Sequence, residues 1–187
     1  MRFSRRFMLG LAVAVPVSTL GAQGGRGLDS LLAPHRAAMK ALAALDGVWQ
    51  GDGRIFSASG DQSTFQQTIR VTSLGEGTIK LLEGRSYGRD GQSSNYSVEL
   101  ISFLPATSAY SLRVYTQGAQ ADLPLRPLNG GFTLEYPDGA TTVRFTISVT
   151  ADTWHEVAER RPSSGEPFRF LELNLRRAGK TEPSRPR

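Results

Sequence analysis

The sequence predicts an all-β protein in which consecutive antiparallel strands follow one another along the chain. Three observations support this class. Short runs of alternating apolar and polar residues fill the chain from residue 47 onwards. Turn-forming residues separate these runs, and no helical segment suited to a crossover connection lies between them. With 187 residues, 39% of them hydrophobic, the chain is sized for one domain.

The first 22 residues, "MRFSRRFMLGLAVAVPVSTLGA", combine a basic head with an apolar run and small residues near Ala22. This pattern is typical of a secretory signal peptide. The apolar run is shorter than the roughly 20 residues that span a bilayer, which disfavours a stable membrane anchor. Within it, "SRRFML" resembles a twin-arginine export motif, although paired arginines also occur in ordinary signal peptides. We therefore expect an exported protein, periplasmic or secreted.

Charge argues against one class of partner, and cysteine content excludes two kinds of covalent modification. Residues 1–22 contain three arginines and no acid, so their removal lowers the formal charge from +5 to +2. The remaining arginines are scattered among acidic residues, which gives little support for a nucleic-acid partner. The chain has no Cys. This excludes disulfides and a lipid-bearing cysteine, and the oligomeric state stays open.

One helix is expected before the strands. A Gly-rich spacer covers residues 23–28, and Asp29 or Ser30 can cap a helix that Gly47 ends. The barrel domain with this leader helix is expected over residues 29–178. A Pro-, Arg- and Ser-rich segment follows and is expected to be a disordered tail over residues 179–187.

Ten runs have the alternation and the flanking turns of strands. A change of phase between Phe170 and Leu171 predicts a β-bulge in the last run. Consecutive hairpins are compatible with a sandwich or with a closed up-and-down barrel of about eight to ten strands. We favour the barrel because closure removes exposed strand edges. The expected strands cover residues 47–57, 62–74, 78–88, 95–104, 109–117, 121–128, 131–136, 140–150, 153–161 and 167–177.

The segments "ALDGVWQGDGRI", "TWHEVAER" and "FRFLELNLRR" resemble the lipocalin, or calycin-type, pattern. More closely, residues 40–177 resemble secreted bacterial lipocalin-like proteins with a domain of unknown function. The resemblance implies that Trp49 closes the base of the barrel and that Arg176, or its neighbour Arg177, lies across the indole. Nitrobindin, a haem-binding barrel, shares the Gly-x-Trp motif, but its haem-binding His near the chain end has no counterpart here. No cofactor is therefore expected.

Two strands carry the candidate ligand-binding residues. Trp154 and Glu156 share one face of "TWHEVAER", with His155 on the other. Arg113 and Tyr115 share a face of residues 109–117. If that face points inward, Arg113 can pair with Glu156 or with Glu172 on the last strand and orient a ligand; if it points outward, it is ordinary surface. We take Arg113, Tyr115, Trp154, Glu156 and Glu172 as the candidates.

The sequence gives little support for an enzyme. No nucleophile elbow, phosphate-binding loop or metal-ligand spacing is present, so we expect no metal and name no catalytic residue. The leading hypothesis is an exported barrel that binds a small apolar or amphipathic ligand. Alternatives are a small hydrolase or isomerase using Glu156 and His155, and a solid-core module that binds a partner. The contents of the barrel interior distinguish these.

Overall fold

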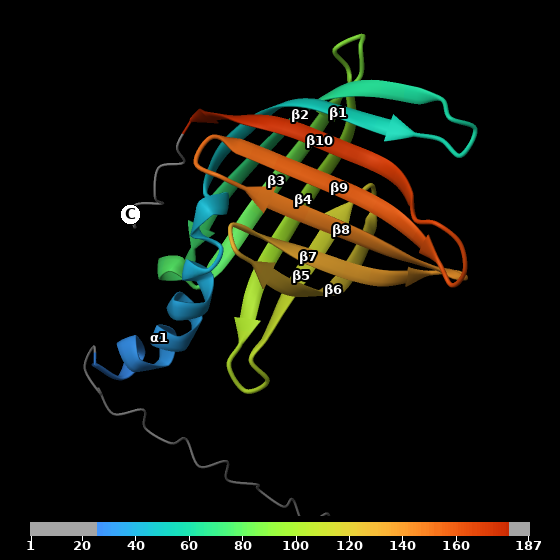
Figure 1. Ribbon diagram of the computed structural model, residues 1–187. Coiled ribbons are helices and arrows are strands. Elements are labelled where there is room, and N and C mark those ends of the chain that lie inside the picture. Colours follow the sequence, from blue (N-terminus) through green and yellow to red (C-terminus); the bar gives the residue numbers. More distant parts are fainter. Residues whose placement is uncertain (1–25, 180–187) are drawn as a thin grey trace, which may run out of the picture.

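The protein is a closed antiparallel β-barrel preceded by one short helix (Figure 1). The computed structural model describes residues 26–179. Each strand pairs with the strands before and after it in sequence, and the last strand pairs with the first, which closes the ring. The prediction of a closed up-and-down barrel, rather than a sandwich, is confirmed. The expected signal peptide (residues 1–22) and all but the first residue of the expected tail lie outside the described residues.

The chain begins with helix α1 and a short 3₁₀ helix, η1, and a second 3₁₀ turn, η2, joins the second and third strands. Ten strands make the barrel within the described residues. Their bounds, with those of the helices, are α1 Arg26–Lys40, η1 Ala43–Leu45, β1 Gly47–Phe56, β2 Gln62–Leu74, η2 Gly75–Gly77, β3 Ile79–Tyr87, β4 Ser93–Leu104, β5 Ala109–Thr116, β6 Ala119–Leu128, β7 Gly131–Asp138, β8 Thr141–Val149, β9 Thr153–Pro162 and β10 Phe168–Gly179.

The observed strands match the expected ones to within about two residues at each end. The pairing of β10 with β9 shifts between Arg169 and Leu171, at the place where the sequence predicts a bulge. The helix differs at both ends. It begins at Arg26, within the expected spacer, and it ends at Lys40 rather than at Gly47, with the separate 3₁₀ helix η1 between them. Within residues 26–179, no helix has the length and apolar character needed to cross a bilayer.

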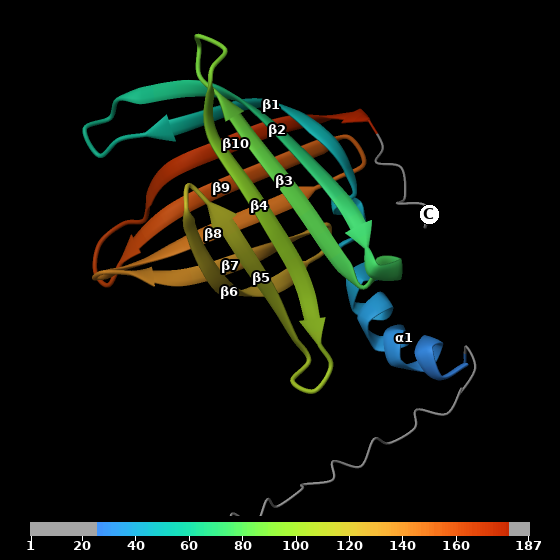
Figure 2. The same cartoon turned by 180° about the vertical axis from the view of Figure 1, so that it is seen from behind.

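Helix α1 and η1 cover one end of the barrel, which we call the closed end (Figures 1 and 2). Met39, Leu42 and Leu45 are buried there against the barrel's own core. The Tyr110 hydroxyl donates a hydrogen bond of 2.9 Å to the Ala38 carbonyl and so ties the helix to β5. The apolar side of this short segment therefore plugs the barrel.

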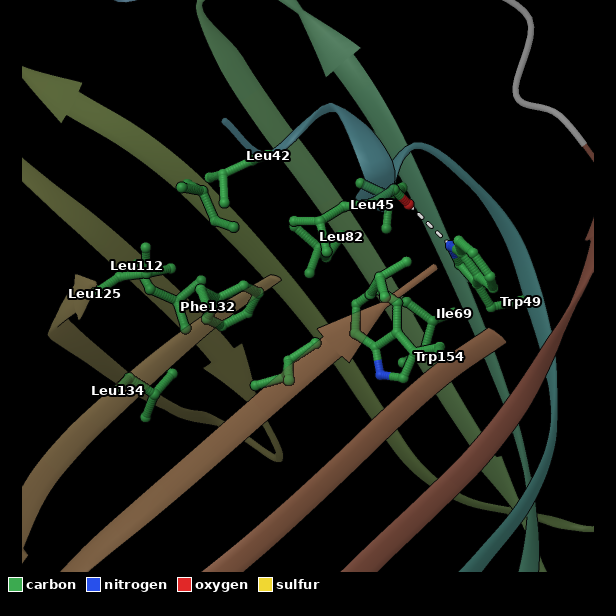
Figure 3. Packing of buried hydrophobic residues seen from close by; sticks show 14 of the residues in the cluster. Leu42, Leu45, Trp49, Ile69, Leu82, Leu112, Leu125, Phe132, Leu134 and Trp154 are labelled. Carbon is green, nitrogen blue, oxygen red and sulfur yellow. Dashed lines mark hydrogen bonds between the residues drawn. The ribbon is translucent and has the colours of Figure 1, made fainter. Parts of the chain in front are cut away.

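Trp49 is fully buried at the closed end, where its Nε1 donates a hydrogen bond of 2.8 Å to the Leu45 carbonyl (Figure 3). Its ring centroid lies 5.8 Å from that of Trp154. The Arg177 guanidinium lies over the indole, with its Cζ 4.0 Å from the ring centroid. A cation over an aromatic face is favourable, more so when water is excluded. Trp49 thus has the closing position that the resemblance implied.

Of the two arginines that the resemblance implied for this position, Arg177 lies over Trp49, and Arg176, which was named first, does not. Leu173 and Leu175 point into the barrel, and the residue two places further on takes the same face, whereas Arg176 points outward. Arg177 also donates hydrogen bonds to the carbonyls of Ala44, Asp46 and Ala151. A single side chain therefore joins β10 to the segment before β1 and to the β8–β9 turn.

Gly47 makes room for this arginine. Its φ of +144° is one that other residues rarely adopt, and a Cβ there would lie 2.2 Å from Arg177 Nη1. The first glycine of the Gly-x-Trp motif is thus explained by the close approach of the guanidinium.

An ion pair between a buried lysine and a half-buried aspartate lies at the same end. Lys80 is only 3% exposed, and its Nζ lies 2.6 Å from Asp46 Oδ2 and 2.8 Å from Ser73 Oγ. Because the ammonium has both a counter-charge and a neutral acceptor, its burial is compensated. The closed end is therefore sealed by apolar packing and by matched charges.

Candidate ligand-binding cavity

The barrel interior holds a cavity of about 830 Å³. It begins next to Trp154 and opens at the end away from α1, where the exposed residues Thr64, Ser94 and Gln117 line it beside the hairpin turns. One side of the cavity, from β7 to β10, is mostly apolar, and we call it the apolar wall. Its apolar side chains are Phe132, Leu134, Phe145, Ile147, Leu171 and Leu173.

The facing side, from β2 to β5, is apolar near the closed end and polar towards the opening. We call the polar part the polar wall. Within it the Ser86 hydroxyl donates a hydrogen bond of 2.6 Å to Gln67 Oε1, so two of its polar side chains hold each other in place. Its members are Gln67, Ser86, Asn95, Ser97, Glu99 and Thr116.

Glu156 projects into the cavity from β9, within the apolar wall. Trp154 Nε1 donates a hydrogen bond of 3.2 Å to its Oε2, which fixes the orientation of the carboxyl group. The pKa of Glu156 is raised to about 7, mainly because burial disfavours the charged form and also because of the negative charge of Glu99, while the bond from Trp154 acts in the opposite direction. Near neutral pH this carboxyl is therefore poised between its two protonation states.

Glu99 lines the cavity from β4, which is five strands away from β9 in either direction around the ring. Burial raises the pKa of Glu99, and the Ser97 hydroxyl, which lies 3.2 Å from its Oε1, partly opposes this. Two acids thus reach into the interior from opposite sides of the barrel, close enough for their charges to interact.

No basic side chain compensates these acids inside the cavity. Among the described residues that line it there is no Lys, Arg or His, and the remaining ionisable group is Tyr136, whose pKa is raised mainly by burial. Nor do residues 26–179 contain a cluster of three or more His, Cys, Asp or Glu able to hold a metal ion. The cavity therefore carries unneutralised acid groups in an otherwise uncharged lining.

The structure brings two of the five ligand-binding candidates, Trp154 and Glu156, into the cavity. The other three lie outside it, so Arg113, Tyr115 and Glu172 are corrected as ligand-binding candidates for this cavity. Arg113 pairs with Asp122 on the outer face of the barrel, at 2.7 and 2.8 Å, and Tyr115 is 40% exposed on that face. Glu172 also points outward, where its carboxylate lies 3.2 Å from Arg169 Nη1.

Strand geometry explains these placements. Leu112 and Val114 line the cavity from β5, so the alternating residues Arg113 and Tyr115 must face solvent. The same alternation separates His155 from Glu156, because neighbours on a strand point to opposite faces. His155 lies 3.7 Å from Glu172 on the outside and cannot share a site with Glu156.

Glu99 is an acid in the cavity that the sequence analysis did not identify, and the other residues of the polar wall were not identified either. On β4 the alternation is misleading, because Tyr96, Val98 and Leu100 give one face the more apolar pattern, yet that face is the outer one. The inner face carries Ser97 and Glu99 because it borders a cavity rather than a packed core. Ile101 could have indicated the inner face. It is fully buried, and it lies two residues from Glu99, so both side chains are on the same face of β4.

Comparisons with known proteins support the fold. No family model and no curated protein matches the chain. Among solved structures, the barrel is similar to the crystal structure of Rv2717c from M. tuberculosis, with a TM-score of 0.56 and 13% sequence identity. The similarity covers 75% of this chain and 96% of that one. At this identity the likeness concerns the architecture alone.

Proposed function

We propose that the protein binds a small, mainly apolar molecule bearing one polar group, inside the barrel. The single observation that carries the proposal is the cavity of about 830 Å³, which has the size of small-molecule sites and pairs an apolar wall with a few polar groups. An interior left this open does not fit a module stabilised by a solid core.

Magnitudes indicate why a polar group matters. Burying about 300 Å² of apolar ligand surface contributes roughly 7 kcal/mol. Association costs at least about 4 kcal/mol, which leaves affinity in the millimolar range. One charge-assisted hydrogen bond adds about 1.5 to 3 kcal/mol and brings Kd towards tens of micromolar. The acids in the cavity supply such a contact.

The test is native mass spectrometry of the protein purified from its own cells, together with binding of an environment-sensitive apolar dye to the emptied barrel. We expect a co-purified small molecule and saturable dye fluorescence. Val114→Phe replaces an isopropyl group with an aromatic ring inside the cavity and should weaken dye binding. Val98→Phe is the matched control, because the same change on the outer face of β4 should leave binding unaltered. Equal dye binding by both variants would contradict the proposal.

An acid–base enzyme is the second candidate, favoured by Glu156, whose pKa of about 7 suits proton transfer near neutral pH. A screen for hydrolase and isomerase activities would compare Glu156→Gln with Glu172→Gln, a control on the outer face. Activity lost only in Glu156→Gln supports this candidate, whereas full turnover in that variant rejects it.

We also propose that the protein acts outside the cytoplasm, on the basis of the signal-peptide pattern in residues 1–22. The mass of the protein recovered from the periplasm should correspond to a chain that begins at Gln23. Recovery of the uncleaved chain from the cytoplasm would refute export.

A further inference from the structure

We infer that the polar group of the ligand is a protonated amine, held between the carboxylates of Glu99 and Glu156. The inference rests on the proposed function, since it names the ligand class for the same cavity. It predicts an amphipathic amine whose apolar body lies against the apolar wall.

The first argument is the placement of the two acids. They come from β4 and β9, on opposite sides of the ring, and both side chains line the same cavity. A cation lying between them would be contacted by negative charge from two directions. An ammonium group, with several N–H donors, can bond to both carboxylates at once.

The second argument is the unused hydrogen-bonding capacity of these groups. Among the described residues, the side-chain donor to Glu156 is Trp154 Nε1, and the donor to Glu99 is the Ser97 hydroxyl. An ionised carboxylate accepts several hydrogen bonds. Both groups therefore keep acceptor capacity directed at the cavity.

The third argument is charge. At the closed end, the buried Lys80 has Asp46 as its partner, whereas the described residues lining the cavity include no cation for Glu99 and Glu156. A carboxylate-bearing ligand would bring a further acid into an interior that already holds two, and an alcohol would offer the ionised form of either acid no counter-charge. An ammonium ion supplies the missing charge.

The experiment compares three probes that share one apolar chain: n-decylamine, n-decanol and n-decanoate. Their affinities for the emptied barrel are measured by isothermal titration calorimetry at pH 8. We expect the amine to bind at least about tenfold more tightly than the alcohol, and the carboxylate to bind most weakly.

Two variants test the residues. Glu156→Gln and Glu99→Gln each keep side-chain shape while removing a charge, and each should lower the amine-to-alcohol affinity ratio several-fold without changing decanol binding. Glu172→Gln, which removes an acid from the outer face next to β9, should leave the ratio unchanged. Two variants on different strands keep the test decisive if one of them folds poorly.

The pH profile gives a further readout. The ionisable groups that face Glu156 in the cavity are Glu99 from β4 and Tyr136 from β7. Preference for the amine should rise between pH 5.5 and pH 8 as the Glu156 carboxyl group, whose pKa is raised to about 7, ionises, because an alkylammonium stays charged throughout that range. Decanol binding should change little.

The outcomes separate the two proposals. If decanol binds and decylamine binds no more tightly, the amine inference is overturned while ligand binding in the cavity stands. Tightest binding by decanoate would overturn it in the same way. If none of the probes binds, and no apolar dye binds either, the proposed function itself fails.

Discussion

The closed end of the barrel and the cavity differ in whether their buried ionisable groups have partners. At the closed end, Arg177 lies on the Trp49 ring and donates to main-chain carbonyls, while Lys80 pairs with Asp46. In the cavity, Glu99 and Glu156 have raised pKa values and no basic partner among the described residues. Pairing compensates the burial of charge at the closed end, whereas ionisation of either acid in the cavity costs stability. The difference supports the proposed role of the cavity acids in binding a ligand.

The largest effect should follow from removing the ring that seals the closed end. Trp49→Ala takes away a fully buried indole and leaves a hole beneath Arg177, so we expect a loss of about 3 to 5 kcal/mol in the free energy of unfolding. Urea denaturation measures it. A loss below about 1 kcal/mol would mean that the closed end does not depend on this residue.

A smaller effect of opposite sign is expected from the cavity. Burial raises the pKa of Glu156 from 4.5 to about 7, so the folded protein favours the protonated form. The stability tied to this group is fully present below pH 4.5 and is lost as the pH rises through 7. Glu156→Gln should therefore stabilise the protein at pH 8, by at most about 3 kcal/mol, and change it little at pH 4.5.

Thermal unfolding of both proteins across pH 4.5 to 8 checks this prediction. Glu99 contributes a slope of the same sign, so some pH dependence should remain in the variant. Equal stability differences at both ends of the pH range would show that Glu156 ionises as freely in the folded protein as in the unfolded one.

The smallest effect distinguishes the two neighbouring arginines. Arg177→Met keeps an unbranched apolar stem but removes the hydrogen bonds to Ala44, Asp46 and Ala151, and we expect a loss of about 1 to 3 kcal/mol. Arg176→Met is the matched control and should stay within about 0.5 kcal/mol of the parent. Comparable losses in both variants would contradict the assignment of Arg177 as the closing residue.

The sequence predicted the barrel well because its signals are local. Each strand shows its own alternation, and turn residues such as Gly139 mark the hairpins. Alternation after the bulge at residues 169–171 puts Leu173, Leu175 and Arg177 on one face. The sequence could therefore have selected Arg177 rather than Arg176. These features depend on neighbours along the chain.

The cavity was harder to predict because it depends on residues far apart in sequence. Alternation assumes that the inner face is the apolar one, and on β4 this would place Tyr96 and Val98 inside and Glu99 outside. Glu99 and Glu156 face the same cavity only because the ring closes and brings β4 opposite β9. Periodicity within one strand contains no information about empty volume between strands.

The contact of Arg177 with Trp49 has a consequence for how the chain is made. The indole belongs to the first strand and the guanidinium to the last. The two groups can therefore come into contact only after nearly the whole domain has been synthesised. Until then β1 and β9 present unpaired edges to other chains. A nascent or truncated chain that stops short of β10 is thus exposed to self-association, and completion of its final strand ends that hazard.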